Sequence, residues 1–364
     1  IGRTLTSLAA LDYPPDRTET FVIADNCTDG TAAAARDLGA TVLERFDAAD
    51  RGKGYALRWA FDMLLAREPR FDGFVVIDAD STASPNFLRV MDAHLRDGAE
   101  AIQSSDMVAR DSRSWSSEIT RLGFTLYNFV RPLGRSVIGG SAGLRGNGMC
   151  FSASLLKRIP WNAFGVTEDL QYGLNLLLNG VKVRFAPDAV VLATMPAIAA
   201  NAETQRVRWE QGRMPVKRHY ARKLLTGAIR KFSYPLLDSW IDLVTPPFVH
   251  LMALNAMALC LHIVLWILAP GLFSVHLLGW GIVLILGLVH VLAGLASAGA
   301  DGRLYLALLY VPRYALWKLL LRQKHPSSRS PEDWIRTTRE KPGTGAPGAG
   351  NNHDGIPVSP HTHQ

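Results

Sequence analysis

The sequence predicts an α/β protein in which a mainly parallel sheet flanked by helices is followed by helices at and across a membrane. Two observations lead to this fold class. Residues 1–200 alternate strand-like and helix-like segments, which is the pattern of helices packed on a sheet. Residues 243–300 contain no Lys, Arg, Asp or Glu. A span takes about 20 apolar residues, so this run is long enough for about two spans, and a purely soluble protein is not expected.

The first part of the chain should fold as strands that each end in a polar loop. The expected strands are residues 20–24, 41–44, 74–77 and 101–104, and the expected helices are residues 31–38, 54–67 and a segment that begins near Pro85. Sheets of this kind bind ligands beyond the carboxyl ends of their strands. Residues 1–11 read as a helix with no strand before it, whereas such a sheet normally opens with a strand. We therefore expect the opening strand to lie upstream of Ile1.

The segment before the charge-free run is strongly basic. Nine Lys and Arg residues lie between Thr204 and Lys231, against the single acid Glu210. Such an excess marks the cytoplasmic flank of a membrane protein. The net charge of +7 therefore does not indicate a nucleic-acid partner, because the charge gathers beside the apolar run and lacks an interleaved aromatic platform. We expect a helix or helix pair over residues 203–225 on the membrane surface.

Four regions are predicted: a sheet domain over residues 1–200, interfacial helices over 201–242, membrane helices over 243–321 and a disordered tail over 322–364. Spans are expected at residues 248–268 and 272–295, joined by a tight turn. Arg313 and Lys318 leave it open whether residues 304–321 cross the membrane or lie at its surface. The 3 cysteines are too few and too scattered for a disulfide framework or a zinc site, which fits a reducing compartment.

The clearest chemical signal is a pair of carboxylates after an apolar strand. Asp78 and Asp80 follow residues 74–77 and would reach the carboxyl edge of the sheet together. Hard oxygen ligands of this kind suit Mg²⁺ or Mn²⁺, which a diphosphate can also bind. The alternative is that these acids merely cap the next helix.

Two other loops carry candidate residues for a nucleotide. Asp25 follows the strand at 20–24 and could accept hydrogen bonds from a base or a ribose, whereas Asp29 is equally well explained as a helix cap. Lys53 lies between Gly52 and Gly54, where the backbone can approach a ligand closely and the cation suits phosphate. The spacing of a Walker loop is absent.

Two motifs further along suggest a base and an acceptor platform. Asp169 follows Glu168 at a predicted helix start, where a carboxylate is either a candidate general base or an ordinary cap. Gln205, Arg208 and Trp209 share a pentapeptide in the basic segment. The guanidinium matches phosphate oxygens and the indole can stack on a sugar, while the alternative is a basic helix on the membrane surface.

In this order the residues resemble membrane-embedded family 2 glycosyltransferases, such as cellulose, chitin and hyaluronan synthases and poly-N-acetylglucosamine synthase. The resemblance runs from residue 1 to about residue 320 and implies a GT-A fold. It rests on five motifs followed by paired apolar spans: Asp25, Gly52-Lys53-Gly54-Tyr55-Ala56-Leu57, Asp78-x-Asp80, Thr167-Glu168-Asp169 and Gln205-x-x-Arg208-Trp209. The family's opening strand and its Pro-x-x-Asn-Glu turn, which helps to bind the uridine, are missing from this sequence.

The resemblance implies a role for each residue on the donor side. Asp25 would contact the uracil, and Lys53 would lie near the nucleotide. Asp78 would help to bind the ribose or the diphosphate. Asp80 would ligate the Mg²⁺ or Mn²⁺ that neutralises the charge growing on the departing UDP.

On the acceptor side the resemblance implies that Asp169 accepts the proton of the attacking hydroxyl, which gives single displacement with inversion. Gln205 and Arg208 would lie by the diphosphate, and Trp209 would form the floor for the acceptor sugar. The segment Gly146-Asn147-Gly148 would lie beside the donor sugar.

The resemblance therefore implies an inverting enzyme that moves a sugar from a UDP-sugar to a polysaccharide or glycan at the cytoplasmic face of the inner membrane. It would be a multi-pass protein, with accessory polysaccharide-export subunits as candidate partners. One alternative is transfer of a single sugar to a lipid, because the Gln-x-x-Arg-Trp motif also resembles ceramide glucosyltransferase and the spans are few for a translocation channel. The other is a non-catalytic nucleotide-binding membrane protein, against which Asp80 and Asp169 argue.

Overall fold

The computed structural model describes residues 1–67, 70–109, 114–194 and 199–314, and it leaves the side chains of residues 199–211 and 270 undescribed. The described residues all belong to one structural unit, Ile1–Trp334. The predicted tail over residues 322–364, and residues 315–321 of the third apolar segment, lie outside the described residues.

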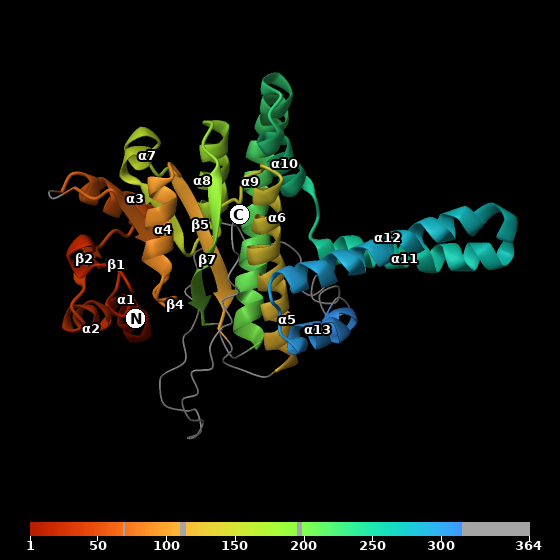
Figure 1. Cartoon of the computed structure of the whole chain (residues 1–364), viewed down its shortest axis with the longest axis horizontal. Helices are drawn as coiled ribbons and strands as arrows, with labels where there is room; N and C mark the ends of the chain where they lie inside the picture. The colour runs from red at the N-terminus through yellow and green to blue at the C-terminus, as the bar shows by residue number, and fades with distance from the viewer. Residues whose placement is uncertain (68–69, 110–113, 195–198, 315–364) are drawn as a thin grey trace, which may run out of the picture. The chain divides into compact units, whose positions relative to one another are not determined.

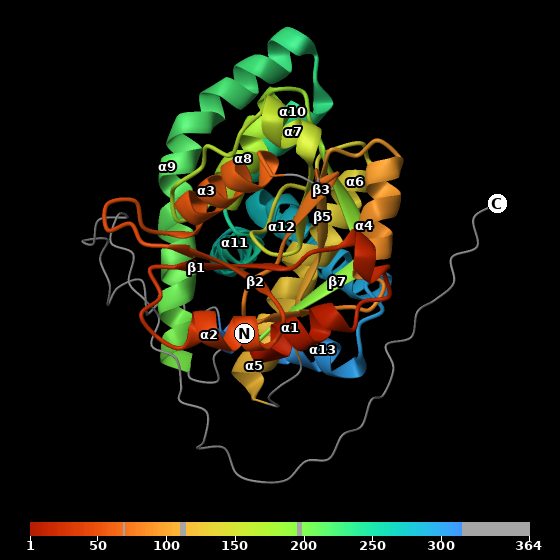
Figure 2. The same cartoon turned by 90° about the vertical axis from the view of Figure 1, so that its left-hand side faces the viewer.

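The strands of the described residues form two sheets (Figures 1 and 2). In the smaller sheet, β1 (Phe21–Asp25) pairs in parallel with β2 (Thr41–Arg45). The larger sheet has the order β3 (Gly73–Val76), β6 (Met149–Ser152), β5 (Ala101–Val108), β7 (Val183–Ala193) and β4 (Ser81–Ala83). The four strands expected from the sequence are confirmed as β1, β2, β3 and β5, each within a few residues of its predicted bounds.

The prediction of a mainly parallel sheet is wrong, because the larger sheet is mixed. Its only parallel pair among the described strands is β5–β7, whereas β3–β6, β5–β6 and β4–β7 are antiparallel. The physical reason lies in the connections. β4 turns back directly after β3, and β6 enters the sheet from the opposite end, after the helices that follow β5. Hydrophobic patterning identifies strands, but it does not give their direction.

The larger sheet is curled, as the link between β3 and β4 requires. These are its two edge strands, yet only residues 77–80 separate them in the chain. In a flat sheet of five strands the edges would lie about 19 Å apart, at about 4.8 Å per spacing. The link is not even extended, since the backbone N–H of Ser81 donates to the carbonyl of Asp78 at 3.0 Å. The register of the β5–β7 pair shifts between Ser104 and Ser105, where β7 carries three extra residues, and irregularities of this kind bend a sheet.

Helices flank the sheets as the sequence predicts. They are α1 (Gly2–Ala9), α2 (Thr31–Asp37), α3 (Lys53–Leu65), α4 (Phe87–Arg96), α7 (Ala153–Arg158) and α8 (Glu168–Leu178), with a short turn η1 (Pro15–Arg17). An aromatic core packs α3 and α8 against β6. In it the rings of Trp161 and Tyr172 lie 4.5 Å apart, and Phe61 and Phe151 pack edge-on beside them. This core positions the first turns of α3 and α8, where Lys53 and Asp169 lie.

A run of helices between β5 and β6 packs against the apolar part of the chain. It consists of α5 (Trp115–Phe124), a π-helical turn η2 (Thr125–Val130) and α6 (Arg131–Val137). A Cβ atom added to Gly294 would lie 2.8 Å from a methyl group of Val130, so η2 and the helix that carries Gly294 are in close contact.

The predicted helix over residues 203–225 is part of one long helix, α9 (Ala199–Lys231), followed by α10 (Tyr234–Val244). Both views show α9 running beside α8 (Figures 1 and 2). Next come α11 (Phe248–Leu268) and α12 (Pro270–Ser297), which pack side by side as a hairpin. The short segments α13 (Gly302–Ala307) and η3 (Leu308–Tyr310) complete the described residues.

By length and composition, two helices of the described residues could cross a membrane. They are Phe248–Leu268 and Gly271–Ser297, with mean hydropathies of 2.2 and 2.3, and only 6% of each apolar window is buried. They match the two spans expected from the sequence. Their exposed apolar side chains are what a lipid environment would cover.

Candidate active site

Lys53 brings three separate loops together at one point. It is the first residue of α3, and its Nζ lies 2.6 Å from the carboxylate of Asp78, after β3. It also donates to the carbonyl of Gly146, before β6, and lies 4.0 Å from the carboxylate of Glu168 at the start of α8. Burial favours the neutral amine, but the two carboxylates outweigh it and raise the pKa of Lys53 above its ordinary value. Lys53 is therefore a cation at neutral pH.

The position of α3 leaves no room for a side chain after Lys53. A Cβ atom at Gly54 would lie 2.2 Å from the carbonyl oxygen of Ala163, in the segment that leads to α8. The glycine thus permits the first turn of α3 to approach the start of α8.

Asp78 and Asp80 lie on the link between the two edges of the curled sheet. The side chain of Asn147 holds this link, because its Oδ1 accepts from the backbone N–H of Asp78 at 3.0 Å and its Nδ2 donates to the hydroxyl of Ser81 at 3.0 Å. Asp80 is exposed. Asn147 is buried between Gly146 and Gly148, whose φ angles of 83° and 66° favour glycine.

Asp106 is a buried acid that the sequence analysis missed. Its carboxylate accepts hydrogen bonds from Asn147 at 3.1 Å and from Asn128 at 3.1 Å. Burial and the charge of Asp78 raise its pKa to about 8. A signal was present in the sequence, since residues 103–106 place four consecutive polar residues in a strand that proves to be buried on both faces. Buried polar groups of this kind are costly unless they are hydrogen-bonded.

Asp169 faces the same point from the start of α8. A Cβ atom at Gly146 would lie 3.4 Å from Asp169 Oδ2 and 3.8 Å from Lys53 Nζ, so the three groups are close neighbours. Burial raises the pKa of Asp169, and burial together with the adjacent Asp169 raises the pKa of Glu168 to about 7. A raised pKa makes a carboxylate a better proton acceptor near neutral pH.

Asp25 lies at the end of β1 and is paired with another residue of the smaller sheet. Its carboxylate accepts from Arg45 at 2.8 Å and from Asn26 at 3.2 Å. Arg45 also contacts Asp47 at 2.9 Å. The contacts described for Asp25 therefore do not join it to Lys53 and Asp78, and no sequence pattern predicted Arg45 as its partner.

Gln205, Arg208 and Trp209 belong to α9, and their side chains lie outside the described part of the structure. Three residues after Trp209, α9 contacts the site. Gly212 accepts through its carbonyl from the hydroxyl of Thr167 at 3.1 Å, directly before Glu168 and Asp169. The pentapeptide thus precedes a contact with the loop that carries the candidate base.

A divalent cation fits these residues only with help from a ligand. Among the described residues, no group of three or more His, Cys, Asp or Glu side chains could enclose a metal ion. The exposed Asp80, with Asp78 two residues before it, offers a few carboxylate oxygens at the edge of the sheet. Mg²⁺ is commonly bound in this way, by one or two carboxylates plus substrate phosphates.

Several curated proteins are similar to somewhat more than half of this chain. A beta-monoglucosyldiacylglycerol synthase of Synechocystis is 29% identical over 219 residues, covering 58% of this chain and 44% of that protein. The probable glycosyltransferase YdaM of Bacillus subtilis is 23% identical over 221 residues, covering 58% of this chain and 51% of that protein. The chain thus spans about half the length of these relatives.

Among solved structures, the mannosyltransferase PcManGT of Pyrobaculum calidifontis, in complex with GDP-Man and Mn²⁺, aligns with a TM-score of 0.49 at 19% identity. The alignment covers 87% of this chain and 83% of that one.

The family model described as "Glycosyltransferase like family 2" matches residues 1–212, which is more than half of the chain and contains every candidate residue above. The mixed sheet flanked by helices agrees with the GT-A-like fold expected for that family. The protein therefore belongs to glycosyltransferase family 2, and it is a glycosyltransferase.

Proposed function

We propose that this protein moves a single sugar, with inversion, from a UDP-sugar to a lipid acceptor at a membrane. The observation that carries the proposal is the convergence of Lys53, Asp78 and Asp169 at one point, beside helices long enough to cross a bilayer. Relatives named beta-monoglucosyldiacylglycerol synthase favour a lipid acceptor over the polysaccharide acceptor implied by the sequence resemblance.

On the donor side, Lys53 and the Asp78–Asp80 link would face the diphosphate. The Lys53 ammonium is compensated by Asp78 and Glu168 and can share its charge with a phosphate oxygen. Asp80, with Asp78, would ligate Mg²⁺ or Mn²⁺, which supplies electrostatic stabilisation of the leaving diphosphate. Asp25 would bind the base, and Gln205 and Arg208 would contact the diphosphate.

On the acceptor side, Asp169 would act as the general base. The acceptor hydroxyl oxygen forms a bond to the anomeric carbon, the bond between that carbon and the phosphate oxygen breaks, and the diphosphate leaves with the electron pair. The hydroxyl proton passes to the Asp169 carboxylate and then to water. Attack opposite the leaving group inverts the anomeric configuration. Trp209 would stack on the acceptor.

We place the catalytic domain, residues 1–200, on the cytoplasmic side, with residues 201–242 at the membrane surface and spans within 243–321. Nine basic residues precede the first span, and the α11–α12 hairpin returns the chain to the side on which it entered. UDP-sugars are made in the same compartment. A lipid acceptor needs no export subunit, because a single transfer leaves the product in the bilayer.

The test is transfer by the full chain in phospholipid nanodiscs that contain diacylglycerol, with radiolabelled UDP-glucose, UDP-galactose, UDP-N-acetylglucosamine and GDP-mannose in separate reactions with Mn²⁺. We expect label from one UDP-sugar in the organic phase, migrating as a monohexosyl lipid. An Asp169→Asn variant is the matched control and should transfer almost nothing. Label in a high-molecular-weight polymer, or transfer from GDP-mannose alone, would contradict the proposal.

A further inference from the structure

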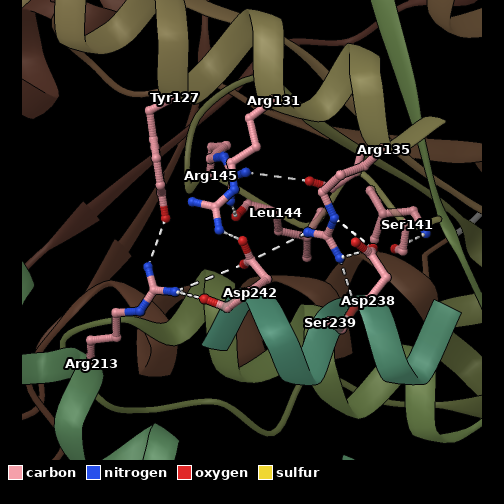
Figure 3. Close-up of polar contacts among 12 residues, drawn as sticks. Tyr127, Arg131, Arg135, Ser141, Leu144, Arg145, Arg213, Asp238, Ser239 and Asp242 are labelled. Atoms are coloured by element: carbon pink, nitrogen blue, oxygen red, sulfur yellow. Dashed lines mark hydrogen bonds and ion pairs between the residues drawn. The ribbon is translucent and has the colours of Figure 1, made fainter. Parts of the chain in front are cut away.

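A group of four arginines, not used above, lies next to the site, and three of them contact Tyr127. We call Arg131, Arg135, Arg145 and Arg213 the arginine cluster. They come from α6, from the loop before β6 and from α9, and Figure 3 shows their guanidinium groups turned toward one another between these elements and α10. Residues far apart in sequence thus gather positive charge at one place.

The carboxylates in contact with the cluster do not balance its charge. Arg135 donates to Asp238 at 2.7 Å and to Ser239 at 2.7 Å (Figure 3). Asp242 contacts Arg131 and lies 3.7 Å and 3.8 Å from Arg135 and Arg213. In the part of the chain that the structure describes, the four guanidinium groups therefore form ion pairs with only two carboxylates, those of Asp238 and Asp242.

Arg145 is the member that makes no hydrogen bond or ion pair with a carboxylate of the described residues, although the charge of Asp169 acts on it. Its two terminal nitrogens reach only the carbonyls of Leu144 and Ala142, at 3.3 Å and 3.4 Å, and its buried Nε makes no hydrogen bond to a described residue. Leaving a buried cationic donor unpaired is costly. An anion that accepted from Arg145 would remove this cost.

Tyr127 marks where an anionic oxygen would be stabilised. Its hydroxyl accepts from Arg213 at 2.9 Å, and the guanidinium groups of Arg145 and Arg131 lie 4.6 Å and 5.0 Å from the centre of its ring. Burial alone would raise the pKa of Tyr127, but these three arginines lower it to about 7. The residue is 39% exposed, so the positive site opens to the surface.

Neighbouring residues link the cluster both to Asp169 and to the apolar helix α12. Arg145 directly precedes Gly146, where a Cβ atom would lie 3.4 Å from Asp169 Oδ2. Tyr127 belongs to η2, and the neighbouring Val130 packs on Gly294 of α12. A ligand at the cluster would therefore come from the membrane.

We propose that the arginine cluster binds the phosphate group of a membrane lipid beside Asp169. Guanidinium forks match phosphate oxygens, and two or more of them can bind the three oxygens of one phosphate at once. The inference rests on the proposed function only in assigning Asp169 to the acceptor side, and binding of the lipid can be measured without any sugar transfer.

The experiment compares two short-chain lipids that differ only in the phosphate: dihexanoylglycerol 3-phosphate and dihexanoylglycerol. Binding of each to the full chain in neutral detergent is measured by isothermal titration calorimetry, with inorganic phosphate as the third probe. We expect the phosphorylated lipid to bind at least about 10-fold more tightly than the other two, which is the scale of one charged hydrogen bond. Arg145→Gln should weaken its binding by about 10-fold to 100-fold.

The matched control is Arg121→Gln on the adjacent helix α5, whose arginine is paired with Glu118 at 2.7 Å and Asp301 at 3.2 Å. It should leave binding unchanged. If Arg145→Gln does not fold, as judged by its unfolding temperature, Arg213→Gln provides the same test. Equal binding of the two lipids, equal binding of inorganic phosphate, or competition by UDP that depends on Arg145 would each overturn the proposal. The last result would assign the cluster to the donor. Failure of sugar transfer with intact lipid binding would contradict only the proposed function.

Discussion

The ammonium group of Lys53 lies 2.6 Å from a carboxylate oxygen of Asp78, although the two residues are 25 positions apart. The ion pair joins the start of α3 to the end of β3. Lys53→Gln should weaken binding of the nucleotide sugar by about 10-fold or more, because a charged hydrogen bond to phosphate is lost and two carboxylates are left uncompensated. Equilibrium binding of UDP to the variant measures this. Lys157→Gln, on the exposed face of α7, is the charge-matched control and should bind UDP normally.

Asp169→Asn should lower kcat by about 10²-fold to 10⁴-fold, which is the usual contribution of a general base. The affinity for the donor should change little, since proton transfer occurs only in the transition state. Steady-state kinetics together with UDP binding separate the two quantities. A variant that lost donor affinity but kept kcat would show that Asp169 is a binding residue.

The pH dependence of kcat should reflect the raised pKa values of the buried acids Glu168 and Asp169. Burial and Asp169 raise the pKa of Glu168 to about 7, and burial raises that of Asp169. A base must be deprotonated to act, so kcat should fall as the pH drops below neutrality, well above the pH near 4 at which an ordinary aspartate titrates. Glu168→Gln removes the neighbouring charge and should move the acidic limb to lower pH. An unmoved limb would mean that the pair does not govern the profile.

Asp80→Asn should abolish metal-dependent turnover and leave the fold intact, because the side chain is exposed at the end of the sheet. The measurement is activity as a function of Mn²⁺ concentration, with circular dichroism as the check on folding. Asp16→Asn, on the exposed turn η1, is a control that removes a surface carboxylate elsewhere. Normal turnover by Asp80→Asn at saturating Mn²⁺ would eliminate it as a ligand.

Asn147→Ala should lower both the stability of the protein and its rate of sugar transfer. The substitution removes the hydrogen bonds of Asn147 to the N–H of Asp78 and to the hydroxyl of Ser81, and it leaves Asp106 with Asn128 as its remaining amide partner. Each buried group left unpaired costs about 1–3 kcal/mol. The unfolding temperature in detergent should fall, whereas Asn175→Ala, which removes only two exposed hydrogen bonds, should leave it nearly unchanged.

The sequence was sufficient for the parts of the fold that depend on local patterns. Alternating segments identified β1, β2, β3 and β5, and the charge-free run identified α11 and α12 within a few residues. The direction of β6 was not predictable, because it depends on where the preceding helices return the chain to the sheet. The prediction of a mainly parallel sheet therefore failed at β6 and β4.

The candidate site was predictable where a motif places residues at the end of a strand or the start of a helix. Lys53, Asp78 and Asp169 are such residues, and the structure brings them together. Asp106 and Asn147 were missed because their importance comes from contacts across the sheet. The arginine cluster was missed for the same reason, since Arg131 and Arg213 meet only after α9 packs beside α8.

The turn that carries Asp78 and Asp80 also has a consequence for how the enzyme responds to its substrate. It joins the two edges of a curled sheet and is held by Asn147 at Asp78 and at Ser81, while the N–H of Thr194 donates to the carbonyl of Asp80 at 3.4 Å. A surface loop ordinarily loses conformational entropy when it closes on a ligand. This turn is held by hydrogen bonds from within the chain, so donor binding should require little reorganisation, and electrostatic stabilisation from preordered groups is the most effective kind.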